Sequence, residues 1–429
     1  MKRILIKDIK EHFGSEVVIA GFVQTIRDQG GIKFFVLRDV SGTVQIVCLK
    51  SEKAVFEFVK ELTLESVVRV TGKAKEEKQA PGGFEVQALK IEMLSKAEPE
   101  LPIPVMEKAN DETEITKRLD WRWLDLRKPE KLMVFKVWTE LERSMREYVL
   151  VEGFIQLYTP SFMMSPSETG SEVFEVEYFD RKAYLAQSPQ FYKQMAMASG
   201  FEKVFAFVPA FRAEPSFTAR HMTEFTSWDF ELSYVDSHYD VMQLEEHLFI
   251  KAFTDLNKNL GLSLDIPKAP FPKVAIADAK KMLKEAGVAS EKAGDVTDEE
   301  ERKLGELIKE KTGSDFVFLI DYPQQARAFY HMRHEDNKEL TKGFDLIFKG
   351  LEVTTGAQRE HRLDVLKAQA LERGMSLEAL EDYLNFFKYG CPPHGGMALG
   401  PGRIVMKILG LSSVKDATFL PRDVRRLRP

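Results

Sequence analysis

The stretch FRAEPSFTARHMTEF, residues 211–225, holds two arginines, a histidine and two glutamates among three phenylalanines. It is too charged for a core strand and too aromatic for an idle surface loop. Strand alternation predicts a hairpin that presents cations to an anion and a phenyl ring to a planar group such as a purine. A surface hairpin laced by Arg–Glu pairs, which add little stability, is the alternative that these residues leave open.

The composition predicts a soluble globular protein of two or three domains, with 429 residues, 44% hydrophobic and 30% charged. No apolar run reaches the roughly 18–20 residues that a membrane span needs. The N-terminal stretch lacks the apolar core of a secretory signal. Cys48 and Cys391 show no metal-like spacing and predict reduced thiols in the cytosol. A net charge of −6 neither indicates nor excludes a nucleic-acid partner.

Residues 1–95 predict a small β-rich domain. Three strand-like runs are followed by a short helical stretch and two more strand-like runs, at 16–28, 32–39, 43–50, 51–62, 66–76 and 84–94. Five strands with a helix after the third match the order of an OB-fold barrel, which often binds single-stranded nucleic acid. An SH3-like barrel without a ligand fits the pattern about equally well.

The remainder predicts a linker and one large α+β domain. Residues 96–127 form the expected linker or hinge, since proline and charge dominate as far as about Thr113 without a sustained period. In the expected domain, 128–429, strands do not alternate regularly with helices, so a doubly wound parallel sheet is disfavoured. Residues 273–315 are charged and helical in pattern, which predicts a peripheral insertion. No GxxxxGK[ST] loop or strand-linked GxGxxG occurs, so side chains would have to hold any phosphates.

Several segments, in order along the chain, resemble aspartyl-tRNA synthetases of the archaeal and eukaryotic type. GFIQLYTP, FRAE…RHMTEF and GPGR resemble motifs one, two and three of class II aminoacyl-tRNA synthetases. RLDWRWLDLR, LAQSPQFYKQMAMASG, GAQREHR, YGCPPHGG and FLPRDVRRLRP sharpen the resemblance, which covers nearly the whole chain. It implies an anticodon-binding OB domain followed by a catalytic domain with a mainly antiparallel sheet flanked by helices. The space between motifs two and three is too short for the extra domain of typical bacterial aspartyl enzymes.

The resemblance assigns an ATP site to the opening stretch and to motif three. Arg212 would hold the α-phosphate and the substrate carboxylate, and Arg220 and His221 the outer phosphates, where fixed cations stabilise the charge that shifts onto pyrophosphate. Phe225 and Arg403 would sandwich the adenine. Arg212 and Arg403 are therefore the expected catalytic residues. The full expected ATP site is Arg212, Glu214, Arg220, His221, Met222, Glu224, Phe225, Glu352, Gly400 and Arg403.

A magnesium ion, the expected cofactor, needs hard oxygen ligands near these phosphates. The resemblance points to Glu352, to Asp345 and to the hydroxyl of Thr355, where the family more often has serine. Without the surrounding motifs, Asp345 and Glu352 would be interpreted as two exposed strand carboxylates.

The same resemblance assigns an aspartate pocket. Arg359 would grip the side-chain carboxylate bidentately and Lys193 would add a second cation, whereas asparagine enzymes usually have an apolar residue there. Two buried cations call for an anion, because a neutral amide would leave charge unpaired. The expected aspartate-binding residues are Glu168, Gln190, Lys193, Arg212, Asp229, Thr355 and Arg359. By itself, Lys193 would be interpreted as a solvated helix residue.

In the barrel, Phe34 would stack on an anticodon base, Gln45 and Glu85 would contact base edges, and Pro81 would tune recognition of the third base. Strand alternation should turn either Phe34 or its neighbour Phe35 inward. Pro81 resembles relaxed enzymes that charge both tRNA(Asp) and tRNA(Asn), whereas Gln24 fits neither pattern.

Two departures from the family stand in motif three. Gly402 replaces the usual glutamate before Arg403, which predicts weaker activity or a differently held metal. GGMALG replaces GGFGLG, a milder change.

The sequence thus predicts a cytoplasmic, homodimeric aspartate–tRNA ligase. It would use ATP to convert L-aspartate to its adenylate and transfer the aspartate to tRNA(Asp); charging of tRNA(Asn) stays open. Asparagine–tRNA ligase, a synthetase paralogue that makes a free amino acid, and a regulatory nucleic-acid-binding protein with an inactive catalytic domain are the alternatives. The cation at Lys193 opposes the first and the anticodon-like barrel opposes the second. Only Gly402 favours the third.

Overall fold

The computed structural model describes residues 2–107, 112–165, 173–216, 218–290, 292 and 294–429. They divide into two compact units, Met1–Lys131 and Leu132–Pro429. No helix in these described residues is long and apolar enough to cross a membrane.

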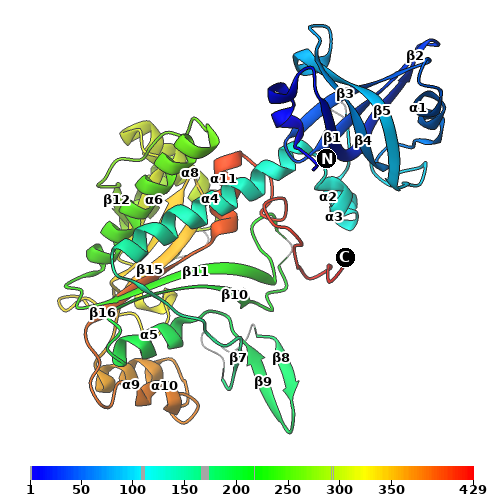
Figure 1. The fold of residues 1–429 in the computed structure, drawn as a ribbon. Coiled ribbons are helices and arrows are strands. Elements are labelled where there is room, and N and C mark those ends of the chain that lie inside the picture. The colour runs from blue at the N-terminus through cyan, green and yellow to red at the C-terminus, as the bar shows by residue number, and fades with distance from the viewer. Residues whose placement is uncertain (1, 108–111, 166–172, 217, 291, 293) are drawn as a thin grey trace. The chain divides into compact units, whose positions relative to one another are not determined.

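The first unit is built around a closed barrel with the strand order β1-β2-β3-β5-β4 (Figure 1). Its strands are β1 (Glu16–Asp28), β2 (Ile32–Asp39), β3 (Gly42–Leu49), β4 (Val67–Glu76) and β5 (Phe84–Ser95). Helix α1 (Lys53–Phe58) follows β3, as predicted for an OB fold. Side chains alternate along β2, so Phe35 is 1% exposed in the barrel core while Phe34 stays half-buried. The prediction that one of the two turns inward is confirmed.

The end of the segment expected as a linker is helical and lies within this first unit. Helices α2 (Ile115–Asp120) and α3 (Arg122–Asp125) occupy its second half. Arg122 donates to Asp125 at 2.6 Å, and both side chains are fully buried. Some of the charged residues in the segment that was predicted to be a linker or hinge therefore belong to a buried ion-pair network.

The second unit is built on a mixed, mainly antiparallel sheet of eight strands, in the order β12-β13-β14-β15-β16-β11-β10-β6. All neighbours are antiparallel except β12 with β13 and β6 with β10, which confirms the predicted mainly antiparallel sheet. The strands are β6 (Ile155–Gln156), β10 (Lys203–Phe211), β11 (Glu224–Ser233), β12 (Lys273–Ala275), β13 (Phe316–Ile320), β14 (Gly343–Phe348), β15 (Glu352–Arg359) and β16 (His394–Leu399). A separate small sheet contains β7 (Phe162–Met163), β8 (Glu175–Tyr178) and β9 (Arg181–Leu185).

One face of the large sheet is apolar and packs against the helices α4 (Pro129–Val151), α6 (His238–Leu260) and α11 (Pro401–Leu409) (Figure 1). Strand β11 shows why: Trp228 and Phe230 enter this core, fully buried. The period of two turns the intervening Asp229 and Glu231 to the opposite face. That opposite face therefore carries the polar side chains of the candidate site.

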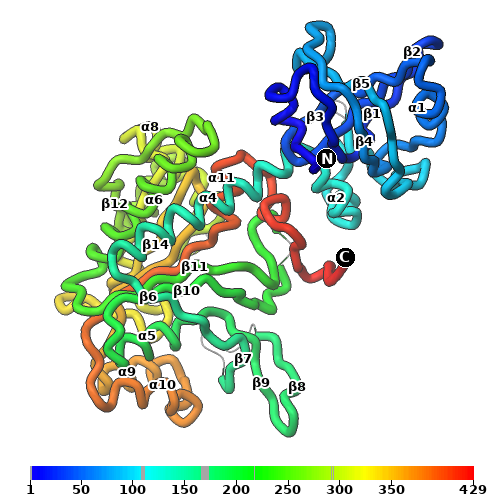
Figure 2. The backbone as a smooth tube through the Cα atoms, in the orientation of Figure 1, coloured from blue at the N-terminus to red at the C-terminus, as the bar shows by residue number. Residues whose placement is uncertain are grey.

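Two groups of helices border this polar face. Helices α5 (Gln190–Ala198), α9 (Leu363–Glu372) and α10 (Glu381–Asn385) share one apolar cluster and lie together in Figure 2. Helices α7 (Ile276–Glu285) and α8 (Asp298–Thr312) pack on Val317 and Leu319 of β13. The segment 273–315, expected at the periphery, thus adds the edge strand β12 to the sheet and places α8 on the polar face.

Candidate active site

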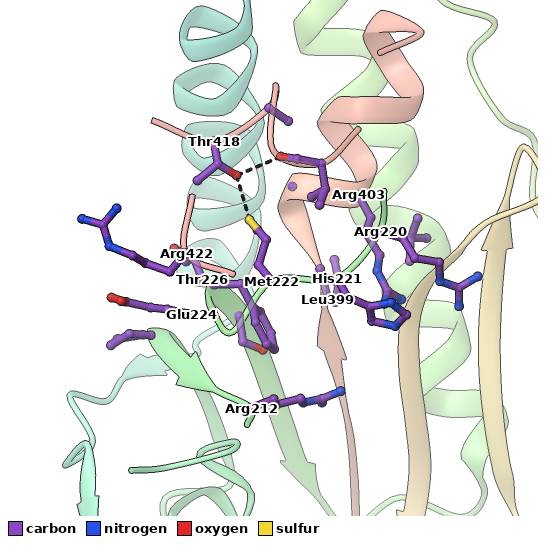
Figure 3. Close-up of a pocket in the computed structure, with 18 of the residues that line it drawn as sticks. Arg212, Arg220, His221, Met222, Glu224, Thr226, Leu399, Arg403, Thr418 and Arg422 are labelled. Atoms are coloured by element: carbon purple, nitrogen blue, oxygen red, sulfur yellow. Dashed lines mark hydrogen bonds between the residues drawn. The ribbon is translucent and has the colours of Figure 1, made fainter. Parts of the chain in front are cut away.

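A cavity of about 770 Å³ opens over the central strands of the second unit (Figure 3). Every residue predicted for the ATP site lines it: Arg212, Glu214, Arg220, His221, Met222, Glu224, Phe225, Glu352, Gly400 and Arg403. Thr355, predicted as a metal and aspartate ligand, lines it as well. The structure therefore brings together residues that lie as far apart in the sequence as motifs two and three.

At one end of the cavity, Arg220 and His221 lie side by side (Figure 3). The Nδ1 atom of His221 is 2.6 Å from the Thr218 hydroxyl oxygen. Burial, with the nearby charges of Arg403 and Arg220, lowers the pKa of His221. Its imidazole can offer a phosphate a hydrogen bond.

The guanidinium of Arg220 is held by carboxylates from α8. It forms two hydrogen bonds to Glu301, of 2.9 and 3.0 Å, and an ion pair of 2.9 Å with Asp298. Burial and the charge of Glu352 raise the pKa of Glu301 to about 7, so its ionised form depends on the bond to Arg220.

Away from that end, Arg212 and Glu224 lie on the motif-two hairpin, and Phe225 follows on β11. Arg212 follows β10, and its backbone N–H donates to the Thr223 carbonyl at 2.9 Å, which closes the hairpin. Its guanidinium carbon lies 5.4 Å from the centre of the Phe225 ring. The hairpin thus presents a cation and an aromatic face to the same cavity, as the opening stretch predicted.

Arg403 and Glu352 link motif three to β15. Arg403, in the first turn of α11, donates to the Glu352 carbonyl at 3.0 Å and pairs with its carboxylate at 3.4 Å. Burial alone would raise the pKa of Glu352, but Arg403 and Arg220 outweigh it, so its pKa lies below the ordinary value. The Thr355 hydroxyl donates to the same carboxylate at 3.2 Å. An ionised carboxylate and a hydroxyl therefore lie together near Arg220.

Asp345, the third predicted metal ligand, does not line the cavity. It is 5% exposed on β14 and receives two hydrogen bonds from Arg327, one of them 3.0 Å long. Among the described residues, no group of three His, Cys, Asp or Glu side chains could hold a metal. A Mg²⁺ ion needs only one or two carboxylates when phosphates supply other ligands, so Glu352 and Thr355 fit such an ion. Asp345 pairs in register with Thr355, and its carboxylate is held by Arg327.

Lys193, Asp229 and Arg359, three of the residues predicted for aspartate, form a second, buried cluster on the same face of the sheet, whereas Arg212 and Thr355 line the cavity. Lys193 of α5 is fully buried, with its ammonium 2.9 Å from Asp229 Oδ1 and 3.3 Å from Glu231 Oε2. Arg359, at the end of β15, donates to Glu231 Oε1 at 3.0 Å and to the Gly396 carbonyl at 3.0 Å. Two cations and two carboxylates therefore balance one another.

This balance corrects the argument that two buried cations call for an anionic substrate. Glu231, which the sequence interpretation missed, bridges Lys193 and Arg359, and those cations keep its pKa low in spite of complete burial. A β-carbon at Gly396 would stand 2.1 Å from Glu231 Oε2, so only glycine leaves room for this carboxylate. Glu231 stands two residues after Asp229 in one strand, and that period of two was the signal available in the sequence.

Gln190 and Glu168 were also predicted to bind aspartate. Gln190 begins α5 and is 5% exposed, and its Nε2 atom is buried without a hydrogen-bond partner in the described residues. An unsatisfied buried amide next to Lys193 is a group that a substrate could satisfy. Glu168 falls outside the described residues.

On the barrel, three of the predicted anticodon contacts lie on neighbouring strands. Gln45 of β3 donates to Glu85 of β5 at 3.1 Å, and Arg27 of β1 donates to Gln45 at 3.3 Å. Phe34 pairs in register with Arg27. Pro81 lies in the turn before β5. Arg27 was missed from the sequence, and it adds a cation to the surface where Phe34 was expected to stack.

The departure at Gly402 has a structural counterpart. Gly402 lies in the first turn of α11, where a β-carbon would stand 3.0 Å from Val414 and 3.6 Å from the Trp138 ring. The Trp138 indole N–H donates to the Ala417 carbonyl at 2.6 Å, which holds the ring in place. A β-carbon at this position would therefore be crowded by Val414, although Gly402 lines the cavity.

Comparisons with known proteins agree with this geometry. The family described as "tRNA synthetases class II (D, K and N)" matches residues 114–424, and "OB-fold nucleic acid binding domain" matches residues 17–94. Aspartate–tRNA(Asp/Asn) ligase of Methanopyrus kandleri is 44% identical over 98% of this chain and 97% of its own length. Aspartate–tRNA(Asp) ligase of Pyrococcus abyssi is 39% identical over 97% of each chain.

A solved structure, asparaginyl-tRNA synthetase from Pyrococcus horikoshii complexed with asparaginyl-adenylate, is similar over 100% of both chains, with a TM-score of 0.92 and 31% identity. The aspartate and asparagine enzymes thus share one fold, and the choice between the two amino acids must come from individual side chains. Because the first family match spans most of the residues and the relatives are similar over nearly their full length, the chain belongs to the class II tRNA synthetases of the D, K and N group, with an N-terminal OB-fold domain.

Proposed function

We propose that the protein is an aspartate–tRNA ligase that activates L-aspartate with ATP and transfers it to tRNA(Asp). The observation that carries the proposal is the fully buried ammonium of Lys193, which pairs with Asp229. If Asp229 binds the substrate's α-ammonium, one of the two cations, Lys193 or Arg359, is left for a side-chain carboxylate, because Glu231 balances only the other. Relatives that are 44% and 39% identical are named aspartate–tRNA ligases, which supports the same choice.

In the first step, an oxygen of the aspartate α-carboxylate attacks the α-phosphorus of ATP, and the bond to the β-phosphate oxygen breaks to release pyrophosphate. Arg212 would neutralise the five-coordinate phosphorus, and Arg220 would neutralise the departing pyrophosphate. His221, which lines the same cavity, would add a hydrogen bond. The protein supplies position and charge, so no nucleophilic side chain is needed.

The adenine would lie between the Phe225 ring and the Arg403 guanidinium. Glu214 and Glu224 line the cavity and would position the adenine and the ribose. Glu352 and Thr355 would hold a Mg²⁺ ion, which when bound would neutralise phosphate charge. The interaction of Arg403 with the Glu352 carbonyl ties the adenine end of the site to this carboxylate.

The substrate side chain would enter the balanced cluster around Glu231. Its carboxylate would be held by Lys193 and Arg359, and its α-ammonium by Asp229 and Gln190. Bidentate binding by a fixed guanidinium suits a carboxylate better than an amide, since the amide nitrogen would face other donors. Asparagine would therefore leave a buried donor unsatisfied.

In the second step, a hydroxyl of the tRNA's terminal adenosine attacks the activated carbonyl and AMP leaves. Phe34, Gln45 and Glu85 would recognise the anticodon, and Pro81 would influence whether tRNA(Asn) is accepted. We further propose a cytoplasmic homodimer, in which the motif-one helix α4 and strand β6 form the interface, as the family resemblance implies.

Aspartate-dependent exchange of pyrophosphate into ATP tests the activation step without tRNA. Exchange should depend on aspartate and on magnesium, and asparagine should not support it. Equal exchange with asparagine would favour asparagine–tRNA ligase, the function named for the solved structure of similar fold. No exchange with either amino acid would refute the proposal.

A further inference from the structure

Glu301 of α8 is a buried charged residue that none of the roles above uses. It is 2% exposed, yet it lies at the phosphate end of the cavity, where its two oxygens accept hydrogen bonds from the terminal nitrogens of Arg220. One of these oxygens also accepts the backbone N–H of Glu352 at 2.8 Å. A single carboxylate thus holds both an arginine and the start of the strand that carries the expected metal ligand.

The position of Glu301 is fixed by close packing of α8 against the sheet. Leu304 and Ile308, three and seven residues further along the helix, are buried against β13. A β-carbon at Gly305 would stand 2.7 Å from the backbone nitrogen of Gly350, in the turn before β15. Backbone atoms of the helix and of the turn are therefore in close contact, and this packing fixes the position of α8.

The geometry at Arg220 leaves one edge of the guanidinium unused. Glu301 binds the terminal edge, formed by Nη1 and Nη2, while the Nε atom is buried and has no hydrogen-bond partner among the described residues. A buried N–H without a partner is costly, and phosphate oxygens accept from the Nε edge of arginine in the same planar manner as a carboxylate. The pairing with Glu301 thus fixes the position of the Arg220 guanidinium, whose Nη2 atom also lies 3.7 Å from the Glu352 carboxylate.

We propose that Glu301 is a positioning residue for ATP, which holds the guanidinium of Arg220 by its terminal nitrogens at the end of the cavity where the outer phosphates would bind. The inference rests on the proposed phosphate role of Arg220. It gives the helix α8, which the sequence placed at the periphery, a part in ATP binding. Asp298, which is more exposed, assists Arg220 from the same helix.

The test compares Glu301→Gln with Glu299→Gln, a matched control that removes an exposed carboxylate from the same helical turn. In pyrophosphate exchange, Glu301→Gln should raise KM for ATP by about 10- to 100-fold, since hydrogen bonds to charged groups contribute that much. KM for aspartate should change less than about threefold, and the control should match the wild type. An equal rise in both KM values, or an unchanged KM for ATP, would overturn the inference.

The variant Arg220→Gln distinguishes a failure of the proposed phosphate role of Arg220 from a failure of the inference about Glu301. If this variant leaves KM for ATP unchanged, the proposed phosphate role of Arg220 fails, and the inference fails with it. If it raises KM for ATP but Glu301→Gln does not, only the inference about Glu301 fails. In the double variant, loss of Glu301 should add less than about twofold to the effect of Arg220→Gln, because it acts through that arginine. If the effects of the two substitutions on KM for ATP were additive, Glu301 would not act through Arg220.

Discussion

Replacing Lys193 with methionine tests the choice of amino acid most sharply, because the side chain stays unbranched, is only one atom shorter, and loses the ammonium group with its charge and N–H donors. The Lys193 ammonium lies 2.9 Å from Asp229, 3.3 Å from Glu231 and 3.3 Å from the Met397 carbonyl. Without it, Asp229 loses its ion pair with Lys193 and Glu231 keeps the one with Arg359, so the cluster carries a net negative charge before the substrate arrives.

The substitution Lys193→Met should lower both the activity and the stability of the protein. A charged hydrogen bond to the substrate carboxylate contributes about 1.5–3 kcal/mol, so kcat/KM for aspartate in pyrophosphate exchange should fall by roughly 10- to 150-fold. Removing one partner of a buried ion pair costs about 3–5 kcal/mol, so thermal unfolding should begin at a lower temperature. Because an amide gains little from Lys193, the preference for aspartate over asparagine should shrink.

Lys203→Met is the matched control, since Lys203 makes one exposed hydrogen bond, to the Glu152 carbonyl. It should leave both kinetics and stability close to those of the wild type. The reasoning is refuted if Lys193→Met folds normally and keeps the wild-type KM for aspartate and the wild-type discrimination against asparagine.

Three further predictions concern other parts of the molecule. Gly402→Glu should lower stability by about 1–3 kcal/mol in thermal unfolding without raising kcat, because its β-carbon meets Val414 at 3.0 Å; a more active variant of unchanged stability would contradict this. Phe34→Ala should raise KM for tRNA by roughly 5- to 150-fold and leave pyrophosphate exchange unchanged, whereas an unaltered KM for tRNA would exclude the stacking role. Burial raises the pKa of Glu245 to about 8, so the folded state keeps a proton that the unfolded chain loses above about pH 4.5. Stability should therefore fall between pH 4.5 and 8 by at most about 1.4 kcal/mol per unit, and Glu245→Gln should remove this slope; an unchanged slope would show that another group is responsible.

Much of the fold could be predicted because its signals are local. The five strands of the barrel, the helix α4 and the motif-two hairpin each show their own period or turn residues in sequence. The residues that line the cavity could be predicted to lie together because they belong to motifs whose order resembles a known family. Glu231 was within reach of the same reasoning, since it stands two positions after Asp229 on one strand.

The remainder depends on contacts between segments that are distant in sequence. Nothing near Asp345 indicates that Arg327 occupies it. Likewise, no local pattern connects Glu301 with Arg220, which lies 81 residues away. A buried ion pair looks the same in sequence as two solvated charges, and only packing of the flanking apolar residues distinguishes them.

The measurement that tests the central claim most directly is charging of purified tRNA(Asp) and tRNA(Asn) with labelled aspartate or labelled asparagine, in the presence of ATP and magnesium. The account predicts aspartyl-tRNA(Asp) and no asparaginyl-tRNA of either kind. Attachment of aspartate to tRNA(Asn) as well would indicate that the barrel near Pro81 is permissive, with the amino-acid pocket unchanged. Attachment of asparagine, or failure to charge tRNA(Asp) with aspartate, would contradict the account.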